Sequence, residues 1–141
     1  MTRDEVIELF ARRQACWDAR DAAGLAATHR PDGMIISPML GRPHGQDAIA
    51  ESYAALFRLF SDWQFTGGEL LIDGDRVAQP FSVTATHTGE FLGLPPTGRR
   101  FQVDGVLLLT LADGLVQLER RTYDFTGLLI QVGVLKSKPA V

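Results

Sequence analysis

Residues 100–123 read RFQVDGVLLLTLADGLVQLERRTY, and this stretch decides the fold. Two runs of strand-forming residues, Arg100–Leu111 and Leu115–Tyr123, are joined by Ala112-Asp113-Gly114. Because an Asp-Gly pair favours the positive backbone angles of a tight hairpin, the two runs are predicted to be neighbouring antiparallel strands. The segment 106–111 is apolar on both faces, so it must be covered on both sides. One cover is the core and the other is a partner sheet, and we therefore expect a homodimer.

Two further strand runs precede this hairpin. They span Gln64–Ile72 and Arg76–Thr88, and Asp73-Gly74-Asp75 joins them as a second tight turn. A longer loop, Gly89–Gly98, leads into the first strand of the hairpin already described. The second half of the chain is therefore predicted to be a meander of strands.

The first half has the period of helices. Thr2 and Glu5 form a capping box, and apolar positions then follow at helical spacing to about Arg20. The remaining elements before the meander are a short helix from Asp21 through Thr28, a strand over Met34–Ile36 and a helix from about Gln46 to Phe60. Helices followed by strands indicate an α+β fold, in which about three N-terminal helices pack against a curved antiparallel sheet of about four to six strands.

Composition narrows the function. The 141 residues are one domain by size, and 45% hydrophobic with 22% charged residues is ordinary for a globular protein. A net charge of −3 gives no basic face, so nucleic acid is not an expected partner. The chain shows neither an apolar run long enough to span a bilayer nor a signal-peptide pattern, so we expect no membrane association. A single cysteine, Cys16, fits a reducing compartment, and we expect a cytoplasmic protein.

Alternation along the strands places candidate side chains on one face or the other. In the second run Gln79, Phe81, Val83 and His87 share the apolar face, unless a bulge at Pro80 shifts the count before it. In the last run, five residues share a face whose apolar members point to the core: Val116, Leu118, Arg120, Thr122 and Asp124. A carboxylate at the inner end of that face would be desolvated, and its pKa would rise toward the range useful for proton transfer.

Other site chemistries lack support in the sequence. The three histidines have no ligand-like spacing, and His29 and His44 lie in turn-like contexts that we expect to be exposed, so no metal site is predicted. The glycine-rich loop 89–98 has no P-loop lysine and no dinucleotide fingerprint. No nucleophile elbow is present. We expect a site that uses no cofactor.

Three segments resemble a known family. THTGEFLGLPPTG at residues 86–98 is similar to a segment of the SnoaL-like polyketide cyclases. Residues 123–133, YDFTGLLIQVG, resemble the closing segment of the same family, and Ser61-Asp62-Trp63 is similar to its FPDW segment. The resemblance implies a cone-shaped α+β barrel around an apolar pocket. Ketosteroid isomerase, scytalone dehydratase, limonene epoxide hydrolase and nuclear transport factor 2 share this fold.

The resemblance also implies a reaction and its residues. Asp124 would be the acid/base of an intramolecular aldol-type cyclisation of an apolar, carbonyl-bearing substrate. His87 would lie beside the reacting carbonyl. The expected walls of the substrate pocket are Trp17, Tyr53, Phe57, Phe81, Val83, Phe91, Arg120 and Thr122.

Several alternatives stay open at this stage. The same pocket could serve an isomerase, a dehydratase or an epoxide hydrolase, because a fold does not fix a reaction. It could also bind a hydrophobic ligand without catalysis. For single residues, Asp124 could be a structural carboxylate held by Arg120 or Arg121, and His87 could be a core histidine.

Overall fold

The computed structural model describes residues 1–91 and 93–136, so Leu92 of the THTG segment lies outside the described residues. The helices are α1 (Arg3–Ala19), α2 (Ala22–Ala27), α3 (Gln46–Leu59) and α4 (Phe125–Gln131). The strands are β1 (His29–Ile36), β2 (Gln64–Gly67), β3 (Leu71–Asp73), β4 (Arg76–Thr86), β5 (Arg100–Ala112) and β6 (Leu115–Tyr123).

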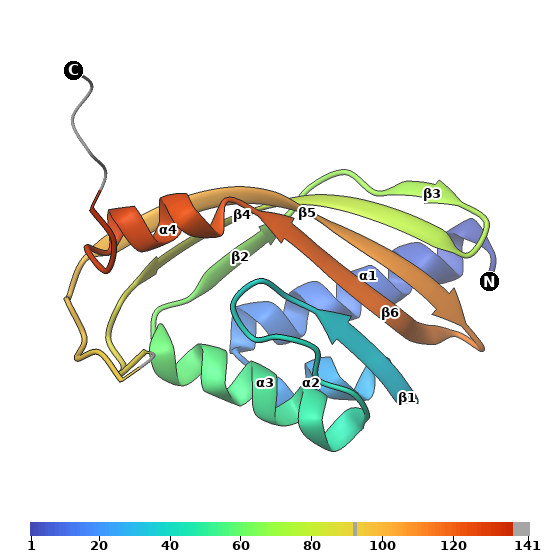
Figure 1. Ribbon diagram of the computed structural model, residues 1–141. Coiled ribbons are helices and arrows are strands. Elements are labelled where there is room, and N and C mark those ends of the chain that lie inside the picture. Colours follow the sequence, from blue (N-terminus) through green and yellow to red (C-terminus); the bar gives the residue numbers. More distant parts are fainter. Residues whose placement is uncertain (92, 137–141) are drawn as a thin grey trace.

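The strands form one curved sheet in the order β1-β6-β5-β4-β2. β3 pairs with the first residues of β4, and β2 pairs with a later part of the same strand. Figure 1 shows this sheet bending around α1, α2 and α3, while α4 follows β6 at one end. The predicted α+β architecture is confirmed. The sheet is mixed rather than wholly antiparallel, since β1 runs parallel to β6.

Local chemistry explains where the helices begin. The Thr2 hydroxyl accepts the Glu5 backbone N–H at 3.2 Å and the Glu5 carboxylate accepts the Thr2 N–H at 2.7 Å, which is the predicted capping box. Asp21 caps α2 by accepting the Gly24 N–H at 2.9 Å. The buried face of α1 consists of Val6, Leu9, Phe10, Arg13 and Trp17, so a guanidinium lies among its core residues.

Pro80 breaks the strand predicted over Gln64–Ile72 into β2 and β3. β2 pairs with β4 as far as Phe81, and β3 pairs with it again from Ala78. Pro80 has no N–H to donate in between, and its carbonyl accepts the Gly68 N–H at 2.7 Å instead. On the other side, the ladder from β4 to β5 continues through Pro80 without a shift.

The side chains of β4 point to the faces that were predicted. Gln79, Phe81 and Val83 are buried, and so is His87, which follows directly after the strand. At the end of β6, the side chains predicted to point inward point outward, and those predicted to point outward point inward. Thr110 pairs with Leu118 and Leu111 with Val116, so Gln117 is an extra residue in β6. This bulge moves every later residue to the opposite face. The inward side chains are consequently Glu119, Arg121 and Tyr123, not Arg120, Thr122 and Asp124.

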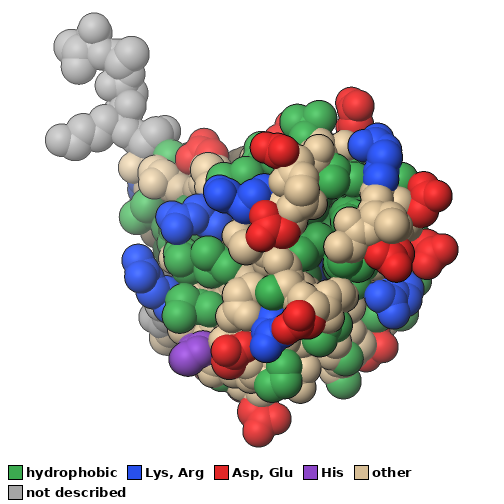
Figure 2. All heavy atoms as spheres, turned by 90° about the vertical axis from the view of Figure 1, so that its right-hand side faces the viewer, with side chains coloured by type: hydrophobic (Ala, Val, Ile, Leu, Met, Phe, Trp, Pro, Cys, Tyr) green, Lys and Arg blue, Asp and Glu red, His purple; other side chains and the backbone are tan. Residues whose placement is uncertain are grey.

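In the described residues no helix is both long and apolar enough to cross a membrane. Figure 2 views one end of the molecule, where acidic and basic side chains are interspersed with hydrophobic ones. That face shows no concentrated basic surface of the kind that binds a nucleic-acid backbone.

Candidate active site

A pocket opens between the curved sheet and the helices. Its empty space is about 420 Å³ when the open solvent at its mouth is counted, and a cavity volume of about 30 Å³ admits the centre of a water molecule. Aromatic and aliphatic side chains dominate its wall, and five of the lining side chains carry a nitrogen or oxygen: Trp17, Ser37, Trp63, Arg121 and Tyr123. The complete lining is Trp17, Ser37, Met39, Leu40, Leu56, Trp63, Phe65, Phe81, Val83, Val103, Leu107, Arg121, Tyr123 and Leu128.

Arg121 brings a charge to this apolar wall. Its side chain is buried, and Nε donates to Glu119 Oε2 at 2.7 Å. The guanidinium carbon lies 5.1 Å from the centre of the Tyr53 ring and 5.9 Å from the nearer Trp17 ring, which is cation–π range. Nη2 is buried and has no hydrogen-bond partner. An unpaired cationic donor on a pocket wall is available to a ligand.

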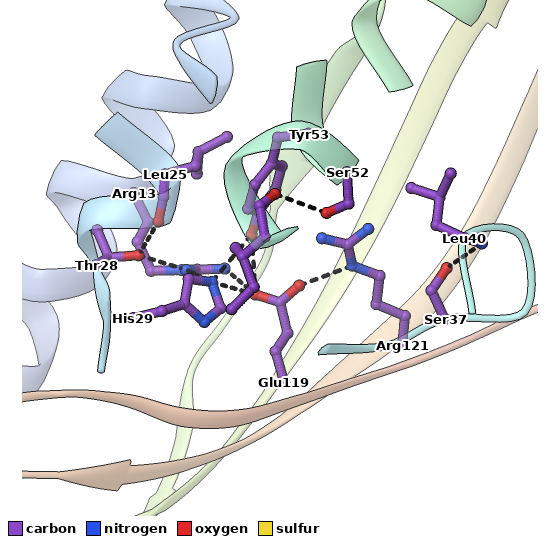
Figure 3. A network of polar contacts seen from close by, with 11 residues as sticks. Arg13, Leu25, Thr28, His29, Ser37, Leu40, Ser52, Tyr53, Glu119 and Arg121 are labelled. Carbon is purple, nitrogen blue, oxygen red and sulfur yellow. Dashed lines mark hydrogen bonds and ion pairs between the residues drawn. The ribbon is translucent and has the colours of Figure 1, made fainter. Parts of the chain in front are cut away.

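A buried polar network fixes this arginine from behind (Figure 3). Glu119 Oε1 pairs with the Arg13 guanidinium of α1 and accepts the Tyr53 hydroxyl of α3 at 3.3 Å. Arg13 also donates to Thr28 at 2.7 Å, and His29 Nε2 lies 3.3 Å from the Tyr53 hydroxyl. The network therefore joins α1, α3, β1 and β6 behind the pocket.

Protonation states follow from burial and from these partners. Burial alone would raise the pKa of the Glu119 carboxyl, but Arg121, Arg13 and His29 hold it well below its usual range. Burial lowers the pKa of Arg121, and Glu119 more than reverses this. Burial lowers the pKa of His29 to about 3, with Arg13 and Arg121 acting in the same direction against Glu119. At neutral pH the network thus holds two guanidinium cations, one carboxylate and a neutral imidazole.

Trp63 supplies a second free donor. Its indole Nε1 is buried without a hydrogen-bond partner, and Trp63, like Arg121, lines the pocket. Burial also raises the pKa of Tyr123, which keeps that hydroxyl protonated. The pocket therefore presents donors to a ligand and can hold an oxygen that carries negative charge. No group of three metal-ligating side chains occurs in residues 1–91 and 93–136.

Asp124 lies elsewhere than predicted. It is exposed, and its carboxylate accepts the Gly127 N–H at 2.9 Å as the N-cap of α4, a helix that the sequence analysis did not predict. The inward orientation expected for Asp124 is wrong because the bulge at Gln117 reversed the count. For the same reason Arg120 and Thr122 are exposed on the outer face and do not line the pocket.

His87 is buried, as its position on the apolar face of β4 predicts, but it is not part of the pocket lining. Its Nδ1 accepts the Thr97 N–H at 3.2 Å, and its buried Nε2 has no hydrogen-bond partner. Phe60 and Phe91 lie beside the ring, at 6.1 and 6.4 Å between centres.

The other predicted wall residues divide in two. Trp17, Phe81 and Val83 line the pocket. Tyr53 is fully buried in the network behind Arg121, and Phe57 is half-buried against Trp17 at 6.1 Å. Phe91 is buried beside His87 and does not line the pocket. The structure thus places three of the predicted wall residues at the pocket but neither of the two residues predicted to catalyse.

Sequence reasoning missed Glu119 and Arg121, and it misplaced His29, which is fully buried and not exposed. His44 is exposed as predicted. One signal was available. Arg13 lies on the apolar face of α1, and a guanidinium there demands a buried carboxylate elsewhere in the chain. The position of that partner depended on the bulge.

The comparisons with known proteins point to the same family as the sequence segments described above. Residues 8–132 match the family model described as SnoaL-like polyketide cyclase. Over 47 residues the chain is 43% identical to nogalonic acid methyl ester cyclase of Streptomyces nogalater, and this match covers 33% of the chain but only 35% of that relative.

Solved structures extend the similarity to the whole fold. AclR of Streptomyces galilaeus, a proposed hydroxylase, is 29% identical with a TM-score of 0.82 over 98% of this chain and 87% of its own. A protein of Catenulispora acidiphila with a ketosteroid isomerase-like fold is 18% identical, with a TM-score of 0.79 over 94% of this chain and 98% of its own. The second likeness concerns the fold alone.

The buried neutral His29 predicts a pH dependence of stability. Its pKa is about 3 in the folded state and near 6.5 when unfolded, so below pH 6.5 the unfolded state binds a proton that the folded state does not. We expect the free energy of unfolding to fall by about 1 kcal/mol per pH unit between pH 6 and pH 4.5. Urea unfolding at several pH values measures this slope. It should flatten in His29→Asn but not in the exposed control His44→Asn, and equal slopes in all three proteins would contradict the assignment.

Proposed function

The chain belongs to the SnoaL-like polyketide cyclase family, and from that premise we propose that it is a cofactor-independent cyclase acting on an apolar, carbonyl-bearing small molecule. The observation that carries the proposal is the pairing of an aromatic pocket with two unpartnered donors, Arg121 Nη2 and Trp63 Nε1. A flat ring system would bury itself against the aromatic wall. A substrate oxygen would then accept hydrogen bonds from the two donors.

The proposed reaction is an intramolecular aldol closure. A carbon next to a carbonyl loses its proton to solvent water, and the enolate charge develops on the carbonyl oxygen. The enolate carbon attacks a second carbonyl of the same molecule, a carbon–carbon bond forms, and the resulting alkoxide takes up a proton. Arg121 and Trp63 stabilise the oxygen that carries the charge, which is the form of catalysis that fixed donors in a dry site perform best.

The test is conversion of nogalonic acid methyl ester, the compound in the name of the curated relative. An aldol closure leaves the mass unchanged, so chromatography with mass detection should show a product of equal mass and new retention time. We expect Arg121→Gln to lower kcat about 100-fold, the usual effect of losing one donor to a developing oxyanion. Arg120→Gln, on the outer face of the same strand, should leave kcat unchanged.

The other possible results of this experiment would each point to a different conclusion. Binding of the ester by calorimetry without any product would point to a non-catalytic binding protein. Conversion that Arg121→Gln leaves unchanged would remove Arg121 from the chemistry. Absence of both binding and product would exclude this ligand class.

The family resemblance assigns proton transfer to Asp124, and that role stays a prediction. Because Asn caps helices as well as Asp, Asp124→Asn keeps the α4 cap and removes only the carboxylate. Exposure and capping favour a structural role, so we expect kcat within threefold of wild type. Asp124→Ala should lower stability by about 1 kcal/mol in urea unfolding. A 100-fold loss of kcat in the Asn variant would instead establish Asp124 as the general base.

We also propose that the protein is a homodimer through the outer face of the sheet. Leu71 and Leu108 lie there with 59% and 44% of their surface exposed. Leu108→Lys should convert a dimer to a monomer in size-exclusion chromatography with light scattering. Ile7→Lys, an exposed apolar position on α1, is the control and should have no effect. A monomeric wild type at micromolar concentration would exclude the dimer.

A further inference from the structure

The charges of the buried network do not balance. Arg13 and Arg121 share the single carboxylate of Glu119, and no other carboxylate is buried among the described residues. His29, the remaining titratable group against Glu119 from β1, adds no negative charge, and neither does the Tyr53 hydroxyl from α3. The network therefore carries a net charge of +1 within the core.

An uncompensated buried cation is costly, and native proteins usually pair such charges. Each arginine has one buried nitrogen without a partner, Nε of Arg13 and Nη2 of Arg121, so their other contacts show which cation is in surplus. Arg13 already has Glu119 and Thr28 as partners on its terminal nitrogens. Arg121 has only Glu119, on Nε, and its Nη2 is free. Arg121 is also the one of the two that lines the pocket.

Figure 3 shows the Arg121 guanidinium between the network and the side chain of Leu40, which belongs to the pocket wall. Arg121 and Leu40 both line the pocket, so a ligand bound there would contact the surplus cation. Trp63, which also lines the pocket, has a neutral donor without a partner. An oxygen held by these donors would complete the charge balance of the core.

We propose that the pocket selects its substrate as an organic anion, with an ionised enol or phenol oxygen on a flat apolar ring system bound at Arg121 and Trp63. The inference rests on the proposed function and names the substrate's charge state. The acidic proton passes to solvent before binding, so the bound enolate already holds the electron pair that forms the new bond. This accounts for a pocket whose described lining holds an arginine but no carboxylate or histidine to serve as base.

A matched ligand pair tests the charge alone. 4-Hydroxycoumarin is an acidic enol that is ionised at pH 7.5, and 4-methoxycoumarin is a neutral compound on the same ring system. In calorimetric titrations of the wild-type protein we expect the ionised compound to bind at least tenfold more tightly. Arg121→Gln should reduce this preference below threefold, Arg121→Lys should retain part of it, and the outer-face control Arg120→Gln should keep all of it.

Thermal unfolding of the unliganded proteins gives an independent measurement. Arg121→Gln leaves Arg13 and Glu119 as a balanced pair, so we expect a midpoint equal to or above that of wild type. Glu119→Gln leaves two buried cations and should lower the midpoint strongly. A midpoint lowered as much by Arg121→Gln as by Glu119→Gln would show that Arg121 is not the surplus charge.

The outcomes separate this inference from the proposed function. Equal binding of both coumarins by wild type would overturn the charge selection and leave a pocket for apolar carbonyl compounds. A preference that survives in Arg121→Gln would place the charge recognition elsewhere and overturn it as well. Binding of neither compound would count against both proposals.

Discussion

The carboxylate of Glu119 is the contact on which the arrangement of this protein depends. It lies on β6, pairs with Arg13 of α1 and Arg121 of its own strand, and accepts the hydroxyl of Tyr53 from α3. Breaking a buried pair by removing one member typically costs about 3–5 kcal/mol, because the other charge is left without a partner. Hydrophobic packing brings the helices against the sheet, but this carboxylate fixes which atoms meet there.

A one-residue irregularity gives Glu119 this position. Without the bulge at Gln117, the alternation from Val116 would direct Arg120 and Thr122 inward. Glu119 and Arg121 share a face of β6 because they are two residues apart. One bulge therefore turns both side chains toward the interior. The pocket cation and its counterion therefore depend on the same local feature of β6.

This feature also marks the limit of what the sequence could predict. The three N-terminal helices, the hairpin turns and the buried face of β4 follow from capping residues and helical spacing, Asp-Gly pairs and uninterrupted alternation, and each was predicted correctly. To place Asp124 correctly, one must know which side chains of β6 point inward after its bulge. No local pattern in the sequence of that strand indicates the extra residue. Helix α4 was missed because its cap, Asp124, had been interpreted as a catalytic carboxylate. Only Arg13, charged on an apolar helix face, pointed toward a buried partner.

The same cone can serve different chemistries because its sheet offers inward positions that sequence changes fill independently. In this chain the inward end of β6 holds donors, and its one carboxylate faces two guanidinium groups. A carboxylate so strongly paired stays ionised but is a weak base, since taking up a proton would leave both cations unpaired. Glu119 is therefore suited to hold Arg121 in place and not to accept a substrate proton. In the proposed reaction the pocket would therefore act by stabilising negative charge on the substrate, so the inferred selection for an anion and the proposed chemistry depend on the same cation, Arg121.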